Sequence, residues 1–176
     1  MVQSNTTGGR PKTERPPYRH AAAGTPGAAS ASDVGDRRPR TTVLARISSD
    51  PIDPAEVADA VTGPERGAVL VFWGVVRDHD HGESVSALEY RAHPDAEKFL
   101  RRCCEDVAAS SGMPTAAVHR VGDLTIGDTA LVAAVASPHR AEAFAALQAL
   151  VDRIKTEVPI WKRQQFPGGT SEWVGL

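Results

Sequence analysis

The chain has 176 residues, a formal net charge of −2 at pH 7, and a composition that is 41% hydrophobic and 24% charged. This length suits one ordinary domain with a core of its own, and the weak net charge gives no reason to expect a general nucleic-acid-binding protein. No apolar run reaches membrane-spanning length and no signal-peptide segment is recognisable, so we expect a cytoplasmic protein. The only cysteines, Cys103 and Cys104, are adjacent and cannot build a disulfide framework.

Residues 1–40 differ in composition from the rest of the chain. They are rich in Gly, Pro, Ala, Ser and Arg, and such a segment buries too little apolar surface to offset the entropy of ordering it. We therefore predict a disordered tail over 1–40 and one domain over 41–176. The tail carries seven basic and three acidic residues, which leaves thirteen basic and nineteen acidic residues in the domain. A cationic cluster within so acidic a domain is less expected by chance than one within a basic domain.

Apolar patterning and turn residues predict the elements in chain order. Strands are predicted at 42–47, 67–76, 85–92, 116–121 and 129–136, and helices at 54–61, 96–110 and 138–157. The run at 67–76 is apolar almost throughout, which is typical of a central strand buried on both faces. Residues 122–127 are predicted to form a turn and bridge. The short connections indicate an α+β domain with a mostly antiparallel sheet and packed helices.

Common signatures of cofactor chemistry are missing from the sequence. It contains no Walker loop, no G-x-G-x-x-G and no nucleophile elbow. The loop Asp78-His-Asp-His-Gly82 alternates metal-ligand residue types, but it lacks a third anchoring element. We therefore predict neither a metal nor another cofactor.

The stretch from Ser137 to Lys162 organises the C-terminal part of the domain. Ser137 and Pro138 suit the cap and first position of a helix. An apolar stripe is predicted along that helix, formed by Phe144, Leu147, Val151 and Ile154. Since Val158 precedes Pro159, the helix should end near Glu157 and the chain should continue extended through Lys162. The same stretch carries four cationic or titratable side chains: His139, Arg140, Lys155 and Lys162.

Arg140 and Lys155 lie near opposite ends of this predicted helix. Fifteen residues at the helical rise separate them by about 22 Å, too far for one small substrate to contact both. Either they serve different sites, or one site takes the front of the helix from one subunit and its end from another. We favour the second alternative, which predicts a homodimer with composite sites. A merely solvated cationic face is the other interpretation of the cluster.

Several segments together resemble one known family. They are GAVLVFWGVVRD (67–78), HRVGDLTIGD (119–128), SPHRAEAF (137–144), DRIK (152–155) and PIWK (159–162). In this order and spacing, they resemble the large, catalytic subunit of molybdopterin synthase, the MoaE family. The resemblance covers about residues 42–174.

The resemblance implies a fold and a function. The fold is an α/β-hammerhead, with a central homodimer within a heterotetramer. Each large subunit would bind a ubiquitin-like small subunit whose C-terminal Gly-Gly carries a thiocarboxylate. The implied reaction is sulfur transfer to cyclic pyranopterin monophosphate, which forms the molybdopterin dithiolene of molybdenum cofactor biosynthesis. The implied substrate-binding positions are Val75, Val76, Arg77, His139, Arg140, Lys155, Lys162, Arg163 and Gln164.

Among these positions we assign Lys155 as the main catalytic residue and Lys162 as its partner. Both partners of the reaction are anionic, so arginines suit phosphate binding, and a lysine among other cations can act as acid or base. Two positions depart from the family, which commonly has Glu where this chain has Gln164 and Arg91. A non-catalytic paralogue that binds the small subunit or a phosphorylated ligand is therefore the alternative.

Overall fold

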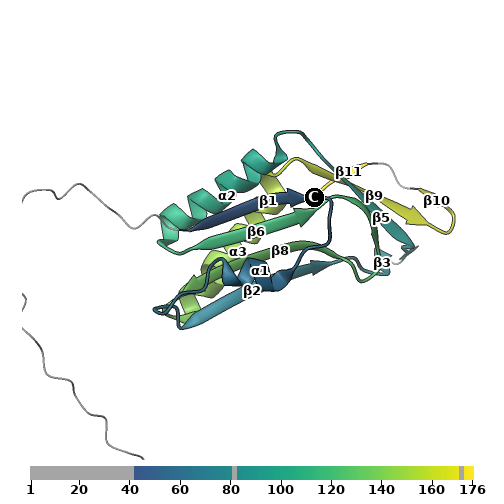
Figure 1. Ribbon diagram of the computed structural model, residues 1–176. Helices are drawn as coiled ribbons and strands as arrows, with labels where there is room; N and C mark the ends of the chain where they lie inside the picture. The colour runs from purple at the N-terminus through teal and green to yellow at the C-terminus, as the bar shows by residue number, and fades with distance from the viewer. Residues whose placement is uncertain (1–41, 81–82, 171–172) are drawn as a thin grey trace, which may run out of the picture. The chain divides into compact units, whose positions relative to one another are not determined.

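The computed structural model describes residues 42–80, 83–170 and 173–176 (Figure 1). The predicted tail at 1–40 lies outside them. The helices are α1 (Pro54–Asp59), α2 (Ala96–Ser111) and α3 (Arg140–Glu157). The strands are β1 (Val43–Ser48), β2 (Ala68–Val75), β3 (His79–Asp80), β4 (Glu83–Ser84), β5 (Ala87–Ala92), β6 (Thr115–Arg120), β7 (Gly122–Thr125), β8 (Thr129–Ser137), β9 (Ile160–Phe166), β10 (Gly169–Thr170) and β11 (Val174–Gly175). Within these ranges, no helix has the length and apolar content needed to span a membrane.

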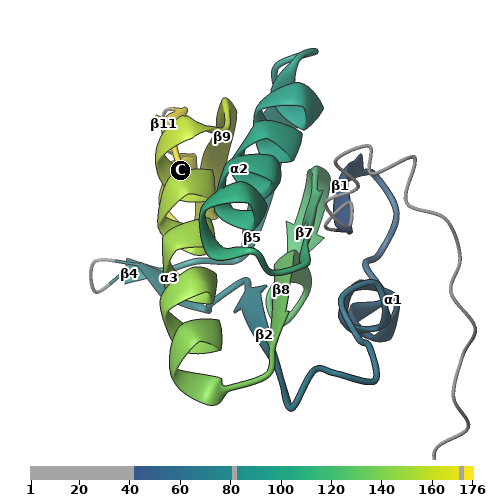
Figure 2. The same ribbon diagram turned by 90° about the vertical axis from the view of Figure 1, so that its left-hand side faces the viewer.

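The first sheet has the strand order β1-β6-β8-β2. Its β1–β6 pair is parallel and its other two pairs are antiparallel. Figure 2 shows α2 and α3 on one side of this sheet and α1 on the other. Alternate side chains of β8 point to opposite faces of the sheet, so they belong to two separate core clusters. Leu131, Ala133 and Val135 pack with α2 and α3, whereas Val132 and Ala134 pack with α1.

The second sheet has the order β10-β9-β5-β7, and β11 pairs with the same strand, β9. All of its pairs are antiparallel. The turn and bridge predicted at 122–127 is partly wrong, because Gly122–Thr125 forms β7 and pairs with β5. The predicted α+β class with mostly antiparallel pairing is confirmed.

Three helix ends follow their sequence signals. The Asp53 side chain accepts a hydrogen bond of 2.9 Å from the amide of Ala55, which caps α1. Gly112 ends α2 in the left-handed region at φ 71°, where a glycine avoids the strain of a Cβ. α3 ends at Glu157, and Val158 is extended ahead of Pro159.

The beginning of α3 differs from the prediction. The helix starts at Arg140, with His139 at the cap position, because Ser137 belongs to β8 and pairs with Ala68. The Ser137 hydroxyl instead accepts a 3.2 Å hydrogen bond from the His139 amide. The predicted stripe is wrong at Phe144, which is 61% exposed. The buried face runs through Ala143, Ala146, Leu150, Val151 and Ile154, because small alanines let the helix approach the sheet closely.

The predicted central position of the 67–76 strand is also wrong. β2 lies at the edge of the first sheet, and its side chains alternate between half-buried and exposed. Val69, Val71, Trp73 and Val75 form one exposed apolar face, on which Trp73 is 56% exposed. We call these four residues the β2 apolar face. Continuous apolar sequence suggested burial on both faces, but within the described part of the chain α1 does not cover this one.

Both cysteines are buried in α2 and have no disulfide partner. Burial raises the pKa of the Cys103 thiol to about 11 and that of the Cys104 thiol to about 12. The reactive thiolate is therefore strongly disfavoured near neutral pH, and neither thiol is a candidate nucleophile.

Gly67 lets the chain ahead of β2 approach the turn that leads into α3. A Cβ added at Gly67 would lie 2.6 Å from the backbone carbonyl oxygen of Pro138. We predict that Gly67→Ala lowers the free energy of unfolding by about 1–3 kcal/mol, because one backbone segment must move. Urea denaturation measures this change.

Gly63→Ala is the matched control. Its added Cβ would meet only the flexible side chain of Arg66, at 3.5 Å. The control should change stability much less than Gly67→Ala does. Equal effects of the two substitutions would show that the close approach to Pro138 does not constrain the fold.

Candidate active site

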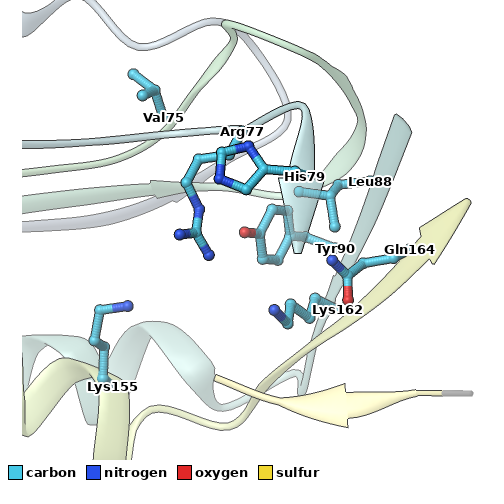
Figure 3. A pocket seen from close by; sticks show the side chains of 8 residues that line it. All are labelled: Val75, Arg77, His79, Leu88, Tyr90, Lys155, Lys162 and Gln164. Atoms are coloured by element: carbon cyan, nitrogen blue, oxygen red, sulfur yellow. The ribbon is translucent and has the colours of Figure 1, made fainter. Parts of the chain in front are cut away.

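A cavity of about 150 Å³ opens where the second sheet meets the end of β2 and the end of α3. Its lining combines basic, neutral polar and apolar side chains: Val75, Arg77, His79, Leu88, Tyr90, Lys155, Lys162 and Gln164. Five of the nine positions predicted from the sequence are among them. Figure 3 shows these side chains, which come from several elements of the fold.

The β5–β9 pairing places part of this lining. In its register Tyr90 lies opposite Lys162, and Leu88 lies opposite Gln164. Side chains alternate between the two faces of a strand, so these four residues share one face of the sheet. Lys162 is half-buried and Gln164 is buried. This face forms one wall of the cavity.

Three cationic groups reach the cavity from three different elements. Arg77 follows β2, Lys155 lies in the last turn of α3, and Lys162 lies in β9. Figure 3 shows their nitrogen atoms directed into the same space, beside the Tyr90 hydroxyl. None of the described lining residues is acidic. Fixed cations of this kind stabilise anionic ligands and the negative charge that develops on them.

Three lining residues were not predicted as site residues: His79, Leu88 and Tyr90. His79 Nδ1 lies 2.6 Å from the Asp78 carboxylate. This hydrogen bond holds the pKa of Asp78 below its ordinary value. Leu88 and Tyr90 could have been predicted as site residues, because they alternate along β5 and lie on the same face of the sheet as Lys162 of the neighbouring strand β9. Among the described residues, no three His, Cys, Asp or Glu side chains gather in an arrangement that could bind a metal.

Two other predicted positions, His139 and Arg140, lie at the opposite end of α3 from Lys155. Both are exposed. Arg140 and Lys155 are fifteen positions apart in one uninterrupted helix, which separates them by about 22 Å. Within one copy of the chain, the structure does not bring this pair to the cavity. Val76 is also absent from the lining, since it is 3% exposed and packs in a core cluster with Val85 and others.

Arg163 lies on the other face of the second sheet, away from the Lys162 side. It donates to Glu89, and Glu89 also accepts a 2.8 Å hydrogen bond from Arg91. These bonds, that from Arg163 first, hold the pKa of Glu89 below its ordinary value. Both guanidinium groups also lie over the ring of Trp173, at 4.7 Å for Arg91 and 4.8 Å for Arg163. This cluster fastens the segment that contains β11 to the back of the sheet.

Comparison with known proteins identifies the relatives of this chain. The MoaE protein family matches residues 47–157. Molybdopterin synthase catalytic subunit 1 of Mycobacterium tuberculosis is 43% identical over 135 residues, which cover 74% of this chain and 89% of that protein. The molybdopterin synthase catalytic subunit of Staphylococcus carnosus is 41% identical over 131 residues, covering 73% of this chain and 87% of that protein.

Solved structures agree with these sequence matches. The crystal structure of molybdopterin synthase from Staphylococcus aureus superposes with a TM-score of 0.70 at 37% identity, covering 75% of this chain and 97% of that chain. A protein–protein complex of subunits 1 and 2 of molybdopterin-converting factor from Helicobacter pylori shares the fold, with a TM-score of 0.55 at 18% identity, covering 77% of this chain and 88% of that chain. By sequence and by fold, the chain belongs to the MoaE family.

Proposed function

We propose that this chain is the catalytic subunit of a molybdopterin synthase. In this function it transfers sulfur from a thiocarboxylated small subunit to cyclic pyranopterin monophosphate and forms the dithiolene of molybdopterin. Family membership supports the reaction class. The observation that carries the assignment to this site is the convergence of Arg77, Lys155 and Lys162 on one cavity.

The proposed reaction brings two anions together, a cyclic phosphate and a thiocarboxylate. Each transfer breaks the carbon–sulfur bond of the thiocarboxylate and a carbon–oxygen bond of the pterin side chain, and forms a carbon–sulfur bond to the pterin. One displaced oxygen stays on the phosphate, whose ring opens, and the other leaves as water. Water also attacks the acyl carbon and restores the C-terminal carboxylate of the small subunit. Arg77 is suited to the phosphate, because a guanidinium offers paired donors. Lys155 moves protons as the main acid–base group, and Lys162 positions the thiocarboxylate.

A ubiquitin-like small subunit with a C-terminal Gly-Gly is the proposed sulfur donor. The Helicobacter pylori relative, which shares this fold, was solved as a complex of two subunits of its molybdopterin-converting factor. The small volume of the cavity, about 150 Å³, suits a glycine tail better than a bulky peptide. The proposed assembly is a heterotetramer with two large subunits at its centre.

The exposed β2 apolar face is evidence for a dimer in which a second copy of this chain packs against it. Ala68, at one end of β2, pairs with Ser137 close to His139 and Arg140, whereas Val75, at the other end, lines the cavity. The strand spans about 24 Å between these ends, nearly the separation of Arg140 from Lys155. A two-fold axis that ran β2 antiparallel to its copy would therefore bring His139 and Arg140 of each subunit to the other's cavity.

One test of the proposed function concerns Lys155. Lys155→Ala should lower molybdopterin formation by about a hundredfold or more, because it removes the acid–base group. The assay incubates the protein with thiocarboxylated small subunit and cyclic pyranopterin monophosphate. Lys98→Ala, which removes an exposed lysine from α2, is the matched control and should retain wild-type turnover. Normal turnover by Lys155→Ala would remove the catalytic assignment, and a wild-type complex without product would favour a non-catalytic paralogue.

Another test concerns the composite site. Arg140→Ala and Lys155→Ala should each be inactive alone, yet mixing and reassociating equal amounts should restore about a quarter of wild-type activity. Half of the dimers would then be mixed, and each mixed dimer would hold one intact site. Activity measured before and after reassociation checks this result.

Lys155→Ala mixed with Lys162→Ala is the control for that experiment. Both lysines line the cavity of one chain, so no mixed dimer would contain an intact site, and activity should stay absent. If Arg140→Ala and Lys155→Ala also failed to complement each other, the two residues would not act across a subunit boundary.

A further inference from the structure

A second cavity, of about 100 Å³, adjoins the first and shares Val75, Tyr90 and Lys155 with it. Its remaining lining is apolar except for one side chain, His119 in β6. His119 is 2% exposed and is not among the nine site positions predicted from the sequence. A buried imidazole beside the proposed acid–base lysine requires an explanation.

The protonation of the His119 ring follows from one contact. Its Nδ1 lies 2.8 Å from the backbone carbonyl oxygen of Arg120. A carbonyl oxygen only accepts hydrogen bonds, so Nδ1 carries the proton. In a neutral ring Nε2 is then an unprotonated acceptor, and it is the remaining polar atom that the ring can offer to the cavity.

The surroundings of His119 keep the ring neutral. Burial, followed by the positive charge of Lys155, lowers its pKa to about 4, although the hydrogen bond to the Arg120 carbonyl acts in the opposite direction. Tyr90 packs against the ring edge-on, with 5.3 Å between ring centroids and an interplanar angle of 75°. The ring is therefore held in both tautomer and orientation next to the cavity that Lys155 enters.

We propose that His119 is a positioning residue for Lys155, whose Nζ donates a hydrogen bond to His119 Nε2 directly or through one water. The buried imidazole would then hold the end of a long, flexible side chain at the junction of the two cavities. Lys155 is exposed and its stem has several rotatable bonds, so an acceptor fixed on the sheet restricts where the amine lies. Holding the amine in this way lowers the entropic cost of reaching the reactive geometry. Its effect on turnover rests on the proposed function, but the hydrogen bond does not.

The hydrogen bond is tested first, without substrate, by nitrogen NMR of the protein labelled at histidine. The chain has six histidines, and His119→Gln identifies the signal of interest by its loss. We expect the tautomer protonated at Nδ1, and an Nε2 resonance that moves in Lys155→Met but not in Lys98→Met. A tautomer protonated at Nε2, or an Nε2 resonance unchanged in Lys155→Met, would overturn the proposal whatever the enzyme's activity.

The contribution of His119 to turnover is tested with two variants, each of which retains a polar atom near only one of the two ring nitrogens. The Gln side chain of His119→Gln can place an oxygen acceptor near the Nε2 position, whereas the shorter Asn of His119→Asn reaches only the Nδ1 position. We expect His119→Gln to keep most of kcat. His119→Asn should lose up to about a hundredfold in kcat, with KM nearly unchanged.

The outcomes separate this proposal from the proposed function. Equal losses of kcat in the two variants, or losses that follow their urea unfolding midpoints, would mean that His119 acts only as a core residue. Wild-type protein that forms no molybdopterin would refute the proposed function, and the NMR result would still decide whether His119 holds Lys155.

Discussion

The register of the β5–β9 pair is the constraint on which the rest of the site depends. With Tyr90 opposite Lys162, one face of the sheet receives a phenol and an amine, and the other receives Glu89 opposite Arg163. A slip of β9 by one residue would turn all of its side chains to the opposite faces of the sheet. Lys162 would then lie behind the sheet, and Arg163 would face the cavity. Backbone pairing of two short strands therefore separates a cationic pocket from an ion-paired structural cluster.

The break between α3 and β9 brings the second lysine into this arrangement. Pro159 cannot continue the helix, so the chain leaves α3 at Val158 and enters β9 at Ile160. Lys155 thus approaches the cavity from a helix end, and Lys162 approaches it from the sheet. Ile154, Val158 and Ile160 are buried around the break, which anchors both lysines to the core through their neighbours. Seven residues separate the lysines in sequence, but two different elements aim them at one space.

Local signals in the sequence sufficed where one residue decides the conformation, as at Asp53, Gly112 and Pro159. They failed where packing decides. Phe144 fits a helical stripe as well as Ala143 does, and only the approach of α3 to the sheet selects the alanine face. The edge position of β2 was equally hidden, because a continuous apolar run does not distinguish a central strand from an edge strand with one exposed apolar face. Lys155 and Lys162 could be predicted from family motifs. The position of His119 beside Lys155 could not, because it depends on packing between elements that are distant in sequence.

The two departures from the family have different consequences in this fold. Arg91 lies on the back of the second sheet, where Glu89 and Trp173 already satisfy its charge, so its exchange leaves the cavity lining unchanged. Gln164 is 8% exposed and lines the cavity itself. A carboxylate at that position would partly neutralise the neighbouring cations, but it would also require one of them as a partner, because a buried charge is costly when unpaired. The neutral amide adds no negative charge to the cavity lining, which under the proposed function would favour the two anionic substrates. Under the proposed function, Gln164 would strengthen anion binding at the expense of one acid–base group, and Lys155 would carry the proton transfers.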